Sequence, residues 1–336
     1  MVGFDLIRGQ DQAVGLLNNL LRKDQIPHAL VLTGIDGIGK QTAARTFAMA
    51  CNCTARQHLR THPSTSPRVN ACGRCRNCRR ILADQHPDIL HLRPSGQMIR
   101  IAVIRDLIQR LALKPYESGK RVVILAEAHT MNPEAGNALL KILEEPPPDT
   151  LLILTARQIA DLLPTIVSRC QQIRFAPLPR EVLVELLMEN EGMLPEDAEA
   201  ATALSEGSYT RAATMAREGW IARRRWLAGE INRLKDQNTT VRLALAEALA
   251  AGKARLPEAL TWLLSWYRDL IVFPIQPDLI VNRDLEDHIR SAAGRGESTL
   301  SLIDRMKAIQ AALRALQNNA NPRLTMELLV LQLAAP

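Results

Sequence analysis

Apolar and polar residues follow two different patterns over the first 175 residues. Short apolar runs bounded by polar residues, glycine or proline predict five strands, at 28–34, 89–94, 121–128, 150–156 and 171–175. The stretches between them predict helices at about 40–50, 100–113 and 137–145, with apolar positions of the second near the helical period. This alternation indicates an α/β module, a parallel sheet covered by helices on both faces.

The strand pattern fades after Pro177 and Pro179. Residues 180–217 have the pattern of three short helices, and helical spacing continues from about 218 to the end. Within this last segment an apolar stripe repeats at spacings of 4 and 3, formed by Leu302, Met306, Ile309, Leu313 and Leu316. All four tryptophans also lie there, and we expect them to anchor a helical core: Trp220, Trp226, Trp262 and Trp266.

The stretch GIDGIGKQT (34–42) follows the first expected strand and precedes a helix, which is the context of a nucleotide-phosphate loop. Its candidate nucleotide-binding residues are Gly34, Gly37, Gly39, Lys40 and Thr42. Glycines let backbone N–H groups close around phosphate oxygens, and the lysine would reach the β- and γ-phosphates.

Two protein ligands for Mg²⁺ are absent from this pattern. Gln41 stands where the loop needs a hydroxyl, and Thr42, one residue later, lies about 100° further round the helix. Ala126 stands where the third strand should end in aspartate, with Glu127 after it. Three readings remain open: a working ATPase, nucleotide binding without turnover, or a loop kept as an element of the fold.

The sequence CGRCRNC (72–78) places three cysteines at the spacing of a metal-binding turn. We expect a structural zinc ion held by Cys53, Cys72, Cys75 and Cys78. The fourth ligand is open at this stage, with Cys53 favoured over Cys51, and His58 and His62 as further alternatives. Cys170 is distant in sequence and is expected to be a small buried apolar residue.

Composition adds little to this picture. A length of 336 residues predicts two or three domains, and 47% apolar residues suffice for their cores. The net charge of +7 is compatible with a partner that carries phosphates. Neither a signal-peptide pattern nor a membrane-length apolar run is seen, so we expect a soluble, cytoplasmic chain.

With these pieces placed, the chain resembles the delta-prime family of bacterial DNA polymerase III clamp-loader subunits, within the AAA+ superfamily. The resemblance covers nearly the whole chain. Its blocks are IPHALVLTGIDGIGK (26–40), CGRCRNC (72–78), HPDILHL (86–92), MNPEAGNALLKILEEPP (131–147), LPTIVSRC (163–170), EGSYTRA (206–212) and NPRLTMELLVLQL (321–333). The HPD block and the altered nucleotide site favour delta-prime over the ATP-hydrolysing tau/gamma subunits.

The resemblance implies three domains: an AAA+ module at 1–176 with a zinc module at about 51–80, a helical lid at 177–217, and a helical collar at 218–336. It implies a ring subunit of the DNA polymerase III holoenzyme that helps load the sliding clamp onto primed DNA. The implied partners are the tau/gamma and delta subunits, the clamp indirectly, and primer-template DNA through the complex. Zinc is the implied cofactor, and ATP or ADP stays open.

The resemblance also assigns roles to single residues. Arg169, in the motif Ser168-Arg169-Cys170, would be an arginine finger given in trans to a neighbour's ATP site. Thr155 and Arg211 correspond to the first and second sensors, and Glu127 to the catalytic position. Asn137 and Lys141 are candidates to position the motif, or alternatively ordinary helix-surface residues.

Two alternatives stand beside this interpretation. One is an ATP-hydrolysing subunit of the tau/gamma kind, which the substitutions at positions 41 and 126 disfavour. The other is a DNA-binding module built on the cysteine turn and the arginines beside it, Arg74, Arg76, Arg79 and Arg80.

Overall fold

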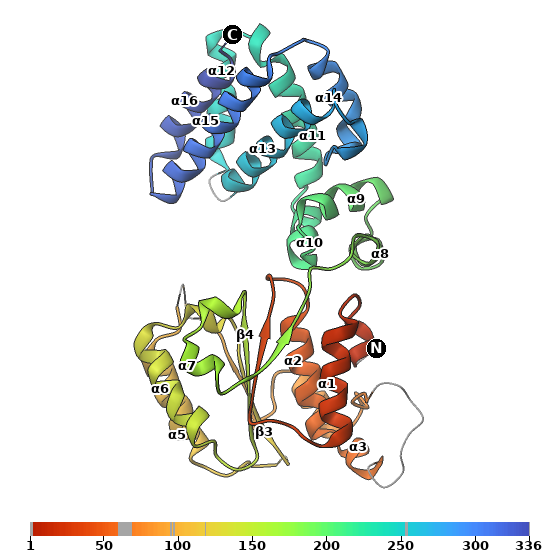
Figure 1. The fold of residues 1–336 in the computed structure, drawn as a ribbon, viewed down its shortest axis with the longest axis vertical. Helices are drawn as coiled ribbons and strands as arrows, with labels where there is room; N and C mark the ends of the chain where they lie inside the picture. Colours follow the sequence, from red (N-terminus) through yellow and green to blue (C-terminus); the bar gives the residue numbers. More distant parts are fainter. Residues whose placement is uncertain are drawn as a thin grey trace. The chain divides into compact units, whose positions relative to one another are not determined.

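A computed structural model describes residues 3–59, 69–94, 96, 98–117, 119–252 and 255–335. The chain forms two compact units, each described by itself below (Figure 1). The first comprises Met1–Val182 and Gly207–Thr210, and the second comprises Leu183–Glu206 and Arg211–Pro336. The finer division into a lid and a collar stays a prediction.

The first unit is built on a five-stranded parallel sheet, as the sequence predicts. Its strand order is β2-β3-β4-β1-β5. The strands are β1 (Ala29–Thr33), β2 (Ile89–Leu92), β3 (Arg121–Leu125), β4 (Thr150–Ala156) and β5 (Gln171–Arg174). Every residue of β1, β3 and β4 is buried, which explains why the central strands are continuous apolar runs rather than alternating ones.

Helices cover both faces of this sheet (Figure 1). On one face lie α1 (Asp11–Lys23) and α2 (Lys40–Asn52), packed against Leu30 and Leu32 of β1. On the other lie α5 (Ile101–Leu111) and α6 (Pro133–Glu144), packed against Val31. The two-residue period of β1 thus divides the first unit's core between its two faces.

The shorter elements of the first unit complete its edges. They are η1 (Phe4–Leu6), α3 (Thr54–Leu59), α4 (Arg76–Leu82), η2 (Ala128–Thr130), η3 (Ile159–Asp161) and α7 (Pro164–Val167). The helix α6 begins at Pro133, four residues before the predicted start. The Asn132 side chain caps it by accepting a hydrogen bond from the backbone N–H of Ala135 at 3.1 Å.

The second unit contains only helices among its described residues. They are most of α8 (Arg180–Glu191), α9 (Pro195–Leu204), most of α10 (Tyr209–Arg217), α11 (Trp220–Arg233), η4 (Leu234–Asp236), α12 (Thr239–Ala251), α13 (Leu256–Val272), η6 (Pro277–Leu279), η7 (Arg283–Leu285), α14 (Glu286–Ala293), α15 (Thr299–Gln317) and α16 (Pro322–Leu333). The three short helices predicted over 180–217 are present. In the described chain, no helix has the length and apolar character needed to cross a membrane.

The tryptophans only partly follow the sequence prediction. Trp220, Trp262 and Trp266 are buried, and the rings of the last two lie 5.6 Å apart. Trp226 is 44% exposed, so its assignment to the core was wrong. The buried face of α11 runs through positions such as Leu227 and Ile231, and position 226 falls outside that stripe.

Candidate functional site

The phosphate-type loop connects β1 to α2, and its backbone explains its glycines. Gly34, Gly37 and Gly39 have φ values of 142°, 79° and 98°, a region that residues with a Cβ rarely adopt. A Cβ at Gly34 would also lie 2.6 Å from the carbonyl oxygen of Phe175. The backbone shape of the loop therefore depends on its three glycines.

Lys40 is buried and its ammonium group is fully engaged within the loop. Nζ donates hydrogen bonds to the carbonyl oxygens of Gly34 and of Ile35, the latter at 2.7 Å. It also lies 3.6 Å from Oδ1 of Asp36. Burial lowers the pKa of Lys40, and the Asp36 carboxylate opposes that shift. On the other side of Asp36, Nε of Arg157 lies 2.6 Å from Oδ2.

The positions that would serve magnesium carry no suitable ligand. Gln41 and Thr42 are exposed on the first turn of α2. Ala126 is buried directly after β3, and Glu127 follows in the left-handed conformation with φ 52°. The backbone N–H of Glu127 donates to Oγ1 of the buried Thr155 at 3.0 Å. Glu127 and Thr155, the residues expected at the catalytic and first-sensor positions, therefore lie next to each other.

Arg211 belongs to the second unit, where Nη1 lies 3.3 Å from Oε2 of Glu206. Its expected role as second sensor stays a prediction.

Arg169 lies just after α7, with its side chain 35% exposed. Its guanidinium donates to the carbonyl oxygen of Thr165 at 2.9 Å and to the Ser168 hydroxyl at 3.4 Å. A third bond, at 2.7 Å, reaches the carboxylate of Glu144 at the end of α6. Cys170 is buried, and burial raises the pKa of its thiol to about 11, consistent with an inert apolar role.

Glu144 is the residue of α6 that contacts the Ser-Arg-Cys segment, whereas the sequence suggested Asn137 and Lys141 for this role. In the described chain, no hydrogen bond joins Asn137 or Lys141 to the Ser-Arg-Cys segment. Both side chains are on the exposed surface of the helix.

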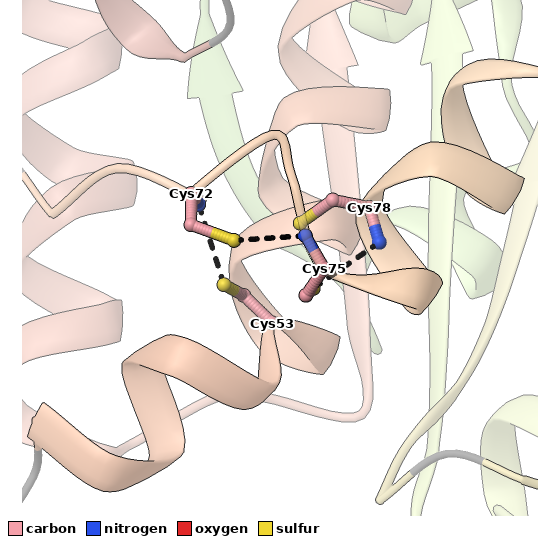
Figure 2. Close-up of side chains that lie close together, drawn as sticks. All are labelled: Cys53, Cys72, Cys75 and Cys78. Carbon is pink, nitrogen blue, oxygen red and sulfur yellow. Dashed lines mark hydrogen bonds between the residues drawn. The ribbon is translucent and has the colours of Figure 1, made fainter.

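Four cysteines converge beside α2 (Figure 2). Their sulfur atoms all lie within 4.8 Å of one another: Cys53, Cys72, Cys75 and Cys78. Backbone N–H groups of Cys72, Cys75 and Cys78 point at the sulfurs of Cys53, Cys72 and Cys75 at 3.3, 3.3 and 3.5 Å. Cys51 is buried outside this group, and His62 lies outside the described residues, as does the side chain of His58.

The hydrogen bonds within the cluster favour the thiolate form of Cys53 and Cys75. The Cys78 thiol donates to Cys53, which lowers the pKa of Cys53 to about 4 and raises that of Cys78. Burial opposes ionisation of Cys75, but hydrogen bonds from Thr54 and Cys78 outweigh it and lower the pKa of Cys75 to about 7. Thiolate is the form of cysteine that binds metal, so this cluster could hold a metal ion.

A buried amide fastens the cysteine cluster to the sheet. The Asn52 side chain donates to the carbonyl oxygen of Lys120 at 2.9 Å and accepts from its N–H at 3.1 Å. The carbonyl oxygen of Asn52 accepts from the side chain of Asn77 at 2.9 Å. These bonds tie the end of α2 to α4 and to the start of β3.

The HPD block has a structural role. Asp88 is fully buried, and its two carboxylate oxygens accept from the backbone N–H groups of Tyr116 and Glu117 at 2.7 and 2.8 Å. The guanidinium of Arg121 lies 3.5 Å away, and it also donates to carbonyl oxygens of the 110–114 segment. Asp88 thus holds the loop between α5 and β3.

Comparisons with known proteins agree on one family. A family model described as "DNA polymerase III, delta subunit" matches residues 9–179, and one described as "DNA polymerase III, delta subunit, C terminal" matches residues 218–335. The DNA polymerase III subunit delta′ of Bacillus subtilis is 29% identical over 96% of both chains. That of Pseudomonas aeruginosa is 33% identical over 78% of this chain and 77% of its own. The chain belongs to the delta-prime family of DNA polymerase III subunits.

Relatives of the gamma/tau kind also match, but this chain covers a smaller share of their length than of the two delta-prime relatives above. The gamma/tau subunit of Mycobacterium tuberculosis is 28% identical over 99% of this chain, which covers 61% of that relative. Among solved structures, a gamma subunit-related protein of DNA polymerase III from Thermotoga maritima superposes with a TM-score of 0.50, at 20% identity over 95% of this chain and 98% of its own. The likeness shows a shared fold, and the predicted α/β module with a parallel sheet, followed by helices, is confirmed.

Three acidic residues of this delta-prime chain escaped the sequence interpretation: Asp36, Asp88 and Glu144. Each lies inside a motif that was recognised, so the motifs were the available signal. Each also pairs with an arginine more than 20 residues away, namely Arg157, Arg121 and Arg169. No spacing rule connects such partners.

Proposed function

We propose that this chain is a non-hydrolysing subunit of the DNA polymerase III clamp loader that supplies Arg169 to the ATP site of a neighbouring gamma/tau-type subunit. In this role it helps the complex load the sliding clamp onto primed DNA. Membership of the delta-prime family supports a place in the clamp-loader complex. The absence of magnesium ligands at Gln41 and Ala126 supports the inference that the chain does not hydrolyse ATP. The neighbouring subunit would supply the magnesium site that Gln41 and Ala126 cannot form here.

The placement of Arg169 carries the proposal. Its guanidinium is at the surface after a short helix that starts at Pro164, where it donates to Thr165 and Ser168 and is ion-paired with Glu144. A permanently charged, planar guanidinium matches phosphate oxygens and can offset the charge that develops during phosphoryl transfer. In well-studied GTPases such an arginine contributes about 10³–10⁵ in rate.

The cysteine cluster supports a structural zinc ion. In a tetrahedral site with Zn–S bonds of about 2.3 Å, the sulfurs are about 3.8 Å apart, which small side-chain adjustments within this cluster would reach. Four thiolate ligands leave no position for substrate, so the ion would stabilise the fold and take no part in catalysis. Cys53 ends α2 and Cys75 caps α4, so the ion would join two helices of the module.

The partners follow from the same proposal. The 218–336 segment would form the collar that joins the tau/gamma and delta subunits, and 177–217 would be the lid. Contact with primer-template DNA and with the clamp would come through the assembled complex. Arg211 would lie at the second-sensor position of a site that does not turn over.

The test is the ATPase rate of the reconstituted clamp loader with clamp and primed DNA. Arg169→Ala should lower the rate at least tenfold while gel filtration shows an intact complex, and Arg169→Lys should recover little because ammonium lacks the planar fork. Arg110→Ala is the matched control, because Arg110 is also exposed and ion-paired, with Asp106 at 2.9 Å. An unchanged rate in Arg169→Ala would refute the finger, and ATP turnover by the isolated wild-type chain would favour the tau/gamma alternative.

A further inference from the structure

The phosphate loop already contains the charges that a nucleotide would need to displace. An ammonium group has three N–H donors. In Lys40 they face the carbonyl oxygens of Gly34 and Ile35 and the carboxylate of Asp36. A β- or γ-phosphate could reach Nζ only by displacing one of these partners, and Asp36 is the one that carries phosphate-like charge.

A second cation holds the Asp36 carboxylate in place. Nε of Arg157, at the end of β4, lies 2.6 Å from Oδ2, while Oδ1 faces Lys40. Asp36 therefore bridges two cations that come from opposite ends of the first unit's sequence. Glu127 also acts on Lys40, so the two cations Lys40 and Arg157 are matched by the two carboxylates Asp36 and Glu127.

The tip of the loop is covered as well. A Cβ on Gly37 would lie 2.4 Å from Oγ of Ser208 and 2.7 Å from Cβ of Thr210. The backbone N–H of Thr210 also points to the carbonyl oxygen of Gly37 at 3.4 Å. The segment Gly207–Thr210 belongs to the same compact unit as the loop, so this contact is internal to that unit. The loop thus serves as a packing surface for Gly207–Thr210, the segment that leads into the start of α10.

We propose that Asp36 acts as a built-in substitute for a nucleotide phosphate at Lys40, and that its negative charge opposes the binding of ADP and ATP at this loop. The proposal concerns the chain's own loop and does not depend on the role of Arg169. It makes the charge of Asp36 the feature to test: the asparagine variant keeps the size of the side chain, removes the negative charge that faces Lys40, and leaves the surroundings with a net positive charge. Because the magnesium ligands are absent, the released site should bind ADP equally well with and without Mg²⁺.

The test is a titration of the full-length chain with a fluorescent ADP derivative, with unlabelled ADP and inorganic pyrophosphate as competitors. Asp36→Asn should bind at least tenfold more tightly than wild type, which corresponds to about 1.4 kcal/mol. The double variant Asp36→Asn/Lys40→Ala should lose this gain. Asp106→Asn is the matched control, because Asp106 is a similarly exposed aspartate paired with Arg110 at 2.9 Å.

Several results would overturn the proposal. They are equal binding by wild type and Asp36→Asn, a gain that survives the loss of Lys40, or an equal gain in Asp106→Asn. Circular dichroism would verify folding of each variant, and Asp36→Ala provides a second route if the asparagine variant does not fold. A negative result in this titration would not affect the Arg169 proposal, because the ATPase assay measures turnover at the ATP site of a neighbouring subunit.

Discussion

The buried carboxylate of Asp88 allows a stability prediction with a worked magnitude. Asp88→Asn keeps the shape of the side chain but leaves one oxygen for two N–H donors, those of Tyr116 and Glu117. Charge-assisted bonds are worth roughly 1.5–3 kcal/mol against about 1 kcal/mol for neutral ones, and a buried donor without a partner costs about 1–3 kcal/mol. With the loss of the charge beside Arg121, we expect the first unit to be destabilised by about 3 kcal/mol.

Hydrogen exchange measured by mass spectrometry can read this effect locally. Peptides that contain Tyr116 and Glu117 should exchange on the order of 100-fold faster in Asp88→Asn, since each 1.4 kcal/mol is a factor of ten. Tryptophan fluorescence provides an internal control, because all four tryptophans lie at 220–266 and report only the second unit. Its urea transition should stay unchanged, as should all exchange in Asp106→Asn. Exchange within about threefold of wild type in Asp88→Asn would refute the reasoning.

Further predictions concern the metal and the arginine. Cys53→Ser should abolish stoichiometric zinc in elemental analysis, whereas Cys51→Ser should retain it, and zinc loss in both variants would contradict the ligand set. Glu144→Gln should raise the ATPase rate of the reconstituted loader by up to about fivefold, because an exposed ion pair of about 0.2–1 kcal/mol no longer competes for Arg169. A loss as large as that of Arg169→Ala would show instead that Glu144 positions the arginine.

Local sequence patterns were sufficient to predict the features that depend on neighbouring residues. The five strands, the glycine loop and most of the helices follow from local patterns of apolar residues, glycine and proline, because secondary structure responds to periods of a few residues. The turn CGRCRNC was also predictable, because one local conformation sets the positions of its three thiols. The amino-acid sequence also showed that position 41 lacks a hydroxyl and position 126 lacks a carboxylate.

The contacts between residues distant in sequence depend on the packing of whole elements. The sheet order β2-β3-β4-β1-β5 sets the end of β1 beside the end of β4, and this brings Asp36 to Arg157 across 121 positions of sequence. The packing of α6 near α7 likewise brings Glu144 to Arg169. Helix α2 delivers Cys53, rather than Cys51, to the other three thiols. Such pairings depend on how whole elements pack, and a pattern over a few residues does not indicate which distant residue will lie beside it.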